Sequence, residues 1–495
     1  MVFSSLLFIY IFLPLLLLCF FVIKNNSWRR LILLVFSLLF YAWGEPVYIL
    51  LMLFSALCNY VFGLLVGAGK TPGARKAAAA GGIFVNLALL GVFKYAGFAV
   101  ETFNALTGLA VPVPAIVLPL GISFYTFQAM TYVIDVYREN CPPQRSFPRL
   151  LLFITFFPQL VAGPIVRYTD MADQLEDMRV SAKDFNDGLY RFAIGLGKKV
   201  VLANTCALAT ENLFGSTAGP TVLGSWGGIL FYAFQIYFDF SGYSDMAIGL
   251  GHMFGFTFPE NFDYPYISKN VTEYWRRWHM TLGGWFRDYL FYPVMRSKGI
   301  TKLAKNLKTT GHKAASKALP TIIALSVVWF STGLWHGASW NYVLWGVYYG
   351  FWLIAEKFVL DKFYKKLPAW LSETLQRVSF VFITLFGFAI FYHEKNLFAN
   401  LGYLFGVGTV GLSNVYAKSM LYENGILLIV AFICSMPIAK ALMSAIRGKM
   451  YAIMGESAAY TIDRLFKTLV VLALFALGTV RLVGDSYNPF IYFKF

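Results

Sequence analysis

The sequence predicts an all-α polytopic integral membrane protein. Of its 495 residues, 58% are hydrophobic and only 13% are charged, whereas a typical soluble domain is about 25% charged. Apolar runs recur along the chain at lengths close to the roughly 20 residues that a spanning helix needs. We therefore expect one membrane-embedded domain over residues 1–495, with about twelve transmembrane helices and further re-entrant or interfacial helices.

The charge pattern indicates a lipid bilayer, not nucleic acid, as the partner of this chain. The net charge is +16, but the basic residues stand in short gaps between apolar runs, as in cytoplasmic loops of membrane proteins. The five cysteines are scattered without paired spacing, so neither a disulfide framework nor a zinc site is predicted.

The short basic stretches between apolar runs indicate where the membrane spans of the N-terminal half begin and end. Residues 6–23 are expected to be a retained first helix, because the basic flank follows the apolar stretch and no small-residue cleavage site is visible. Residues 150–165 contain two prolines and are short for a span, so they are expected to be re-entrant or tilted. The other predicted elements are spans at 31–43, 47–66, 78–98, 116–137, 186–212 and 222–250, with an interfacial helix at 167–185.

The C-terminal half follows a strong cytoplasmic marker. All charged residues between positions 294 and 318 are basic, and such loops stay on the cytoplasmic side. Counting from this loop places both chain termini and the segment His393–Lys395 outside. The predicted spans are 319–336, 338–360, 378–392, 424–445 and 464–484.

His336 is the most informative residue of the chain. It lies between small residues and tryptophans, in Ser331–Trp340, and apolar sequence flanks it on both sides. An ionisable side chain at membrane depth is costly and is therefore a candidate functional residue. The alternative is a histidine that hydrogen-bonds a backbone carbonyl at a helix end.

A second histidine, His279, lies in a segment dense in tryptophan and charge, Thr272–Leu290. On a helix, Trp275 and Arg276 lie one turn before His279, and Glu273 pairs with Arg277. One interpretation is an interfacial helix anchored by tryptophans. The other is the wall of a cytosol-facing cavity in which Arg276 and Arg277 attract a phosphorylated substrate.

Two acids interrupt the apolar run Phe234–Met246. Gln235 and Asp239 share a helix face, and Ser241–Gly242 is a candidate helix break before Asp245. A discontinuous helix with two acids is typical of a transporter cation site. The favoured alternative is structural, with each acid bonded to a neighbouring helix.

Taken in order, these segments resemble the membrane-bound O-acyltransferase family, in its bacterial, alginate O-acetyltransferase-like branch. The resemblance rests on five motifs between residues 118 and 345 and extends through the flanking helices to essentially the whole chain. The motifs are Leu118–Gln128, Phe156–Ile165, Gln235–Asp245, Trp275–Leu290 and Gly333–Trp340.

The resemblance implies a ring of tilted helices around a thinned centre, and it implies roles for particular residues. His336 matches the catalytic histidine of the family, and His279 matches a second active-site histidine. The tail Phe490–Phe495 matches a tyrosine-bearing motif of this branch, which makes Tyr492 a candidate acyl carrier; without the resemblance it is an aromatic anchor. The segments around them supply candidate substrate-binding residues: Trp275, Arg276, Arg277, Trp335, Gln235, Asp239 and Asp245.

The expected function is transfer of an acyl group, acetyl by default, from cytosolic acetyl-CoA toward hydroxyls of a cell-surface or exported polysaccharide. No permanently bound cofactor is expected. The expected location is the bacterial inner membrane, beside an exported acyltransferase or a polysaccharide-synthesis complex. The alternatives are D-alanyl transfer toward teichoic acid and a transporter or flippase that uses Asp239 and Asp245.

Overall fold

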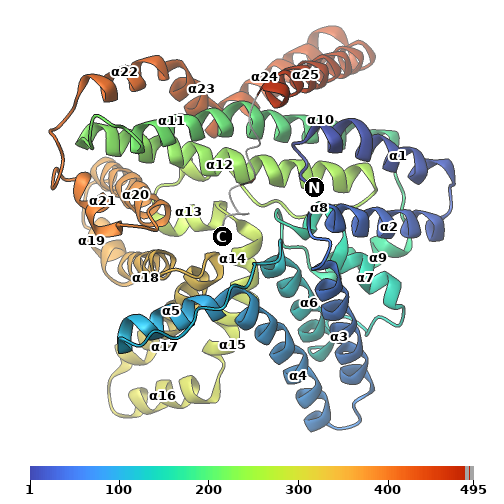
Figure 1. The fold of residues 1–495 in the computed structure, drawn as a ribbon, viewed down its shortest axis with the longest axis horizontal. Helices are drawn as coiled ribbons and strands as arrows, with labels where there is room; N and C mark the ends of the chain where they lie inside the picture. The colour runs from blue at the N-terminus through green and yellow to red at the C-terminus, as the bar shows by residue number, and fades with distance from the viewer. Residues whose placement is uncertain (485–489, 491–495) are drawn as a thin grey trace. The chain divides into compact units, whose positions relative to one another are not determined.

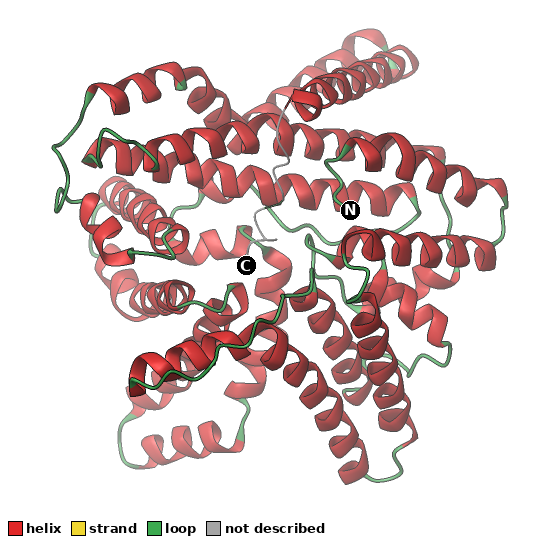
Figure 2. Ribbon diagram, in the orientation of Figure 1, coloured by secondary structure: helices red, strands yellow, loops and turns green. Residues whose placement is uncertain are grey.

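The computed structural model describes residues 1–484 and 490, and these residues form helices joined by loops, with no strand among them (Figures 1 and 2). The chain divides into two compact units by its internal contacts. Unit 1 comprises Met1–Val200, Phe240–Glu260 and Thr468–Phe495, and unit 2 comprises Val201–Asp239 and Asn261–Lys467.

Unit 1 contains the N-terminal helices. Among them, α3, α4 and α6 pack against one another (Figure 1). The helices are α1 (Leu13–Val22), α2 (Asn26–Gly44), α3 (Ile49–Ala68), α4 (Pro72–Leu90), α5 (Ala96–Thr107), α6 (Ile122–Tyr137), α7 (Phe147–Thr155), α8 (Phe157–Leu160), α9 (Tyr168–Glu176) and α10 (Ala182–Gly197).

Two long helices carry the chain between the units. The first, α12 (Val222–Met253), belongs to unit 2 as far as Asp239 and to unit 1 from Phe240 onward. The second, α25 (Glu456–Gly484), enters unit 1 at Thr468.

Unit 2 contains the remaining helices. Within it, α17 and α18 pack extensively against each other. The helices are α11 (Asn204–Phe214), α13 (Val271–Arg277), α14 (Met280–Phe286), α15 (Tyr292–Met295), α16 (Lys298–Thr309), α17 (Lys313–His336), α18 (Trp340–Ala355), α19 (Asp361–Tyr364), α20 (Ala369–Tyr392), α21 (Leu397–Tyr403), α22 (Val415–Glu423), α23 (Gly425–Ser435) and α24 (Ile438–Met454).

The membrane-spanning character is clear from length and apolarity. Among the described residues, seven helices are long and apolar enough to cross a bilayer, or eight if the bent pair α22–α23 forms one span. The predicted count of about twelve spans is not confirmed. The prediction of a multi-pass, all-helical membrane protein is confirmed.

Two predicted spans, 78–98 and 424–445, have wrong boundaries. The span predicted at 78–98 is part of one helical stretch, Pro72–Thr107, that continues through a π-helical turn. The helix predicted at 424–445 is divided between Ser435 and Ile438, where Pro437 cannot donate an interior helical hydrogen bond. The segment 150–165 contains only the short helices α7 and α8 and is almost fully buried in unit 1.

Candidate active site

His336 ends α17, at the point where the chain turns back into α18. The two helices cross closely, since a methyl group on Gly333 would overlap the backbone carbonyl of Tyr342 and one on Gly346 would overlap that of Trp329. Glycine permits this approach because it has no Cβ. Gly333, three residues before His336, therefore serves helix packing.

An aromatic enclosure surrounds the His336 ring. It consists of Trp335, Trp345 and Phe391, whose ring centroids lie 5.0, 4.9 and 5.4 Å from the imidazole centroid. All three rings meet the imidazole nearly at right angles, and His336 is only 4% exposed. Such walls exclude water from the ring and restrict its rotation.

Trp275 forms a second layer behind this enclosure. It projects from α13, and its ring lies edge-on to Trp345, Trp329 and Tyr349 at centroid distances of 5.5, 4.7 and 4.9 Å. Trp275 therefore supports Trp345, which in turn contacts His336. The position of α13 thus bears directly on the shape of the enclosure.

The start of α13 is held by Glu356, a 6% exposed residue that follows α18. Its carboxylate accepts hydrogen bonds from the backbone N–H groups of Val271 (2.7 Å) and Thr272 (2.8 Å) and from the Thr272 hydroxyl (2.7 Å). A carboxylate at a helix N-terminus satisfies otherwise unpaired donors and favours the helix dipole. Glu356 fixes α13 against α18.

His279 lies at a break in the helix that the sequence predicted to be continuous. Residues Trp278 and His279 separate α13 from α14, and His279 has a left-handed backbone conformation with φ of 44°. The loop at Asn261 stabilises this break, because its carbonyl accepts the N–H of Met280 at 2.9 Å. Trp275 and His279 therefore do not lie one turn apart on one helix.

The hydrogen bonds of His279 define which ring nitrogen carries the proton. Its Nδ1 lies 3.0 Å from Asn261 Oδ1, an oxygen that also accepts from the Thr281 hydroxyl at 2.9 Å. Because an amide oxygen only accepts, Nδ1–H donates and Nε2 carries the lone pair. Burial and the neighbouring His336 hold the pKa of His279 well below its ordinary value, so the ring is neutral near pH 7.

The two histidines share a tryptophan between them. Trp335 lies 5.9 Å from the His279 ring and 5.0 Å from the His336 ring, measured between centroids. The structure thus brings together four of the residues predicted from the sequence, namely His336, His279, Trp335 and Trp275. Among the described residues, no group of three or more His, Cys, Asp or Glu side chains is arranged to hold a metal ion.

The two arginines of this segment differ in their contacts. Arg277 forms ion pairs with Glu273 (3.0 Å) and Asp263 (2.7 Å), which confirms the predicted Glu273–Arg277 pair. Arg276 is exposed and has no ion pair within the described part of the chain. Arg276 is therefore the arginine whose charge remains available to an external anion.

The acids of α12 lie in different units. Gln235 and Asp239 belong to unit 2, and Asp239 is only 2% exposed. Asp245 belongs to unit 1 and forms ion pairs with Lys198 (2.7 Å) and Arg191 (3.0 Å). For Asp245, these contacts support the structural interpretation, in which the acid is bonded to a neighbouring helix.

The predicted helix break at Ser241–Gly242 is absent from α12. The helix runs without interruption from Val222 to Met253, and a methyl group on Gly242 would approach the Gly195 carbonyl to 2.8 Å. Gly242 therefore permits close packing of α12 on α10. The interpretation of this segment as a discontinuous transporter helix is wrong.

The C-terminal tail is described only at Phe490. This residue is 3% exposed, and its ring stacks on Tyr243 at a centroid distance of 4.8 Å and lies 5.7 Å from Phe240, all within unit 1. The predicted acyl carrier, Tyr492, lies outside the described residues.

Two residues of the site were not predicted from the sequence. Glu356 is an acid in a largely apolar stretch, so the argument that singled out His336 also applies to it. Asn261 lies in a polar loop whose composition is ordinary. Only the fold shows that its amide holds His279.

Comparison with known proteins identifies the family. The model of the MBOAT, or membrane-bound O-acyltransferase, family matches residues 142–391. The chain is 36% identical over its whole length to the whole of the probable alginate O-acetylase AlgI of Azotobacter vinelandii. It is 31% identical to the peptidoglycan O-acetyltransferase of Helicobacter pylori, over 100% of this chain and 98% of that protein.

A third relative is the teichoic acid D-alanyltransferase of Bacillus subtilis. It is 30% identical to this chain, but the match covers 55% of this chain and 68% of that protein. The residues that the family model matches include His279, His336 and the whole aromatic enclosure. The chain therefore belongs to the membrane-bound O-acyltransferase family and is an O-acyltransferase.

Proposed function

We propose that this protein transfers an acetyl group from cytosolic acetyl-CoA, through a site at His336, toward hydroxyls of an exported or cell-surface polysaccharide. The observation that carries the proposal is the buried His336 ring inside its aromatic enclosure, one tryptophan away from a neutral His279. The named activities of the relatives support the acceptor class, because these proteins are an alginate O-acetylase, a peptidoglycan O-acetyltransferase and a teichoic acid D-alanyltransferase.

The reaction needs a base for a hydroxyl group and an acid for the departing thiolate. In the proposed step, His336 takes the proton of the acceptor hydroxyl while the oxygen attacks the thioester carbonyl. The new C–O bond forms, the C–S bond breaks, and the protonated His336 returns its proton to the sulfur of coenzyme A. The products are an acetyl ester and free coenzyme A, and His336 regains its neutral form.

The charge distribution within unit 2 supports entry of the donor from the basic end of α17. The amphipathic helix α16 packs on the start of α17, where Ser316 donates a hydrogen bond to the Ala304 carbonyl at 2.7 Å. His336 lies at the opposite end of α17, about 36 Å away for a helix of 24 residues. Exposed Arg276 is the proposed contact for a phosphate of coenzyme A.

Tyr492 is the proposed first acceptor of the acetyl group. Its neutral phenol, with an ordinary pKa near 10, needs a base such as His336 to become a nucleophile. Phe490, two positions before Tyr492, stacks on Tyr243 in unit 1, which supports contact between this end of the chain and the protein. A separate exported transferase would then move the acetyl group from the tyrosine ester to a sugar hydroxyl.

Acetyl transfer is favoured over D-alanyl transfer by the extent of the matches. The acetyl-transferring relatives match over the full chain, whereas the D-alanyltransferase matches over 55% of it. A transporter that uses Asp239 and Asp245 has lost its main support, because α12 is unbroken and Asp245 is paired.

The test compares purified wild-type protein with two histidine variants, using acetyl-CoA and release of the free thiol. His336→Ala is expected to lower the rate by roughly 10²–10⁴, whereas His312→Ala, at an exposed loop position, is expected to leave it unchanged. Equal rates in wild type and His336→Ala would overturn the role of His336.

The carrier is tested separately by mass spectrometry of the C-terminal peptide after exposure to acetyl-CoA. An added acetyl group on Tyr492, absent in Tyr492→Phe and in His336→Ala, is the expected result. If polysaccharide acetylation persists in Tyr492→Phe, the tail is an anchor and not a carrier.

A further inference from the structure

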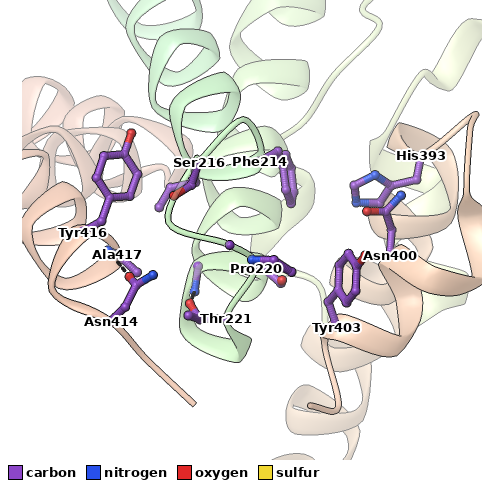
Figure 3. Close-up of a pocket in the computed structure, with 14 residues that line it drawn as sticks. Phe214, Ser216, Pro220, Thr221, His393, Asn400, Tyr403, Asn414, Tyr416 and Ala417 are labelled. Atoms are coloured by element: carbon purple, nitrogen blue, oxygen red, sulfur yellow. Dashed lines mark hydrogen bonds between the residues drawn. The ribbon is translucent and has the colours of Figure 1, made fainter. Parts of the chain in front are cut away.

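A polar cavity lies in unit 2, close to the end of α17 that carries His336. The cavity has a volume of about 280 Å³, and the loop between α11 and α12, the segment after α20, α21 and the start of α22 all contribute to its walls (Figure 3). Binding pockets for small organic molecules begin at about 300 Å³. The cavity therefore matches one small ring-sized ligand.

Contacts within unit 2 connect this cavity to the end of the helices where His336 lies. Asn341, at the start of α18, donates its side-chain amide to the Phe391 carbonyl at 3.0 Å, and Phe391 is part of the aromatic enclosure. Two residues later, His393 lines the cavity. Its ring centroid lies 4.8 Å from the ring centroid of Phe214, which lines the cavity as well. The cavity and the enclosure thus share the C-terminal turn of α20.

The frame of the cavity is built by hydrogen bonds to main-chain carbonyls of distant segments. Val410 donates to the Pro220 carbonyl at 3.0 Å, and Leu223 donates to the Leu412 carbonyl at 3.0 Å. The indole of Trp226 donates to the Leu404 carbonyl, also at 3.0 Å. These bonds join the loop after α11 and the first turns of α12 to the loop after α21, so the cavity is formed before any ligand arrives.

None of the described residues that line the cavity carries a charged side chain, but several of their neutral polar groups have unused hydrogen-bonding capacity. The ring nitrogens of His393, the Ser225 hydroxyl and the Tyr403 hydroxyl make no side-chain hydrogen bond within the described residues. The Asn400 amide donates to the carbonyls of Lys395 and Asn396, which leaves its oxygen as an acceptor. Burial lowers the pKa of His393 to about 4, so its ring is neutral near pH 7.

Aromatic faces complete the lining. Phe214, Tyr403 and Tyr416 surround the cavity, with Tyr416 held by a hydrogen bond from its hydroxyl to the Asn212 carbonyl at 3.1 Å (Figure 3). Rings that offer apolar faces beside neutral donors and acceptors suit a ligand with both C–H faces and hydroxyl edges. An anionic ligand would lack a cation here, and burying an unpaired charge is costly.

We propose that this cavity binds one neutral sugar ring, with its hydroxyls on His393, Ser225, Tyr403 and Asn400 and its C–H face on the aromatic side chains. That the sugar belongs to the acceptor glycan rests on the proposed function; the binding itself does not. Bound there, a glycan chain is held at the end of the helices where His336 lies.

The experiment measures binding in the absence of any acyl donor, so its outcome is independent of catalysis. Methyl β-glucoside and methyl β-glucuronide share one ring and differ in charge, and each is mixed with the full-length protein in detergent. Saturation-transfer difference NMR is expected to show binding of the glucoside and at least tenfold weaker binding of the glucuronide.

The double variant Ser225→Ala/Tyr403→Phe removes two hydroxyls without removing either aromatic wall. It is expected to weaken glucoside binding roughly tenfold, in line with the loss of two hydrogen bonds. Tyr422→Phe, at an 89% exposed position outside the cavity, is the matched control and is expected to bind as wild type does. Unchanged binding in the double variant, or equal binding of the two sugars, would overturn the proposal even if acetyl transfer is intact.

Discussion

Two regions of this protein place a polar side chain in apolar sequence, and they use it in opposite ways. In unit 1, Asp245 is neutralised by Arg191 and Lys198. In unit 2, His336 is enclosed by aromatic rings. Charged partners hold an acid in its ionised state, whereas aromatic walls exclude water from a buried ring without supplying a counter-charge. The neighbours of a buried polar residue therefore indicate its role better than its burial does.

The comparison is tested most strongly by Asp245→Asn. The variant keeps the side-chain size but removes the charge that pairs with Lys198 at 2.7 Å. Loss of hydrogen bonds to charged partners is expected to lower the free energy of unfolding by about 1.5–3 kcal/mol, measured by thermal unfolding in detergent. The turnover per folded molecule is expected to stay the same.

His336→Ala provides the opposite pattern for this comparison. Its turnover per folded molecule is expected to fall by roughly 10²–10⁴, in addition to the stability that is lost when a buried ring is removed. A rate loss in Asp245→Asn beyond its loss of folded protein would contradict the structural role of Asp245.

A second prediction concerns the helix crossing beneath His336. Gly333→Ala inserts a methyl group against the Tyr342 carbonyl, and such overpacking typically costs about 1–3 kcal/mol. We expect a lower unfolding temperature together with reduced turnover, because α18 carries Trp345. Gly299→Ala, where nothing lies within 4 Å of the added methyl group, is the control and is expected to be neutral or slightly stabilising.

Glu356→Gln tests whether the N-terminus of α13 positions the aromatic enclosure. The amide retains one acceptor oxygen but loses the charge that holds Val271 and Thr272. A loss of about 1.4 kcal/mol, or roughly tenfold in kcat, is expected with little change in KM for acetyl-CoA.

The control for this variant is Glu373→Gln. Glu373 is a surface residue that pairs with Arg377 at 3.0 Å, and its substitution is expected to leave kcat unchanged. If both variants lose activity equally, Glu356 has no specific positioning role.

The smallest expected effect is on the pH dependence of stability. Burial and the nearby His336 lower the pKa of His279, whereas an unfolded histidine titrates near 6.5. As the pH falls below about 6.5, the unfolded chain takes up a proton that the folded chain does not, so the stability contributed by this residue is present above that pH and is lost below it. Between pH 7.5 and 6.0 the loss is about 0.8 kcal/mol.

Thermal unfolding of wild type and His279→Asn at these two pH values measures the contribution. The variant is expected to show a smaller decrease in unfolding temperature than the wild type. The buried His393, whose pKa is lowered to about 4, contributes in the same direction in both proteins. Identical decreases would show that His279 is protonated in the folded state.

The fold class was predictable because it follows from composition and from the lengths of apolar runs. The predicted span at 47–66 corresponds to α3 (Ile49–Ala68). A continuous apolar run in a bilayer forms a helix, because a helix satisfies the backbone hydrogen bonds within the segment itself. The boundary near Ser435 was not predictable from hydropathy, which does not register that Pro437 interrupts the backbone ladder.

The candidate site was predictable only in its residue types. His336, His279, Trp335 and Trp275 were singled out from local sequence, and the structure brings them together. The break between α13 and α14 was missed, because helical spacing alone gives no sign that the loop at Asn261 holds His279 in a left-handed conformation.

By itself, the sequence determined that this protein is helical, lies in a membrane, and carries two histidines in unusual apolar and aromatic surroundings. Those properties depend on composition and short-range spacing, which are written directly in the chain. The tertiary structure decided that Asp245 is neutralised by two bases, that Glu356 holds α13, and that His336 is enclosed by aromatic rings from three helices. These features join residues separated by tens of positions, and only packing brings such residues within contact distance.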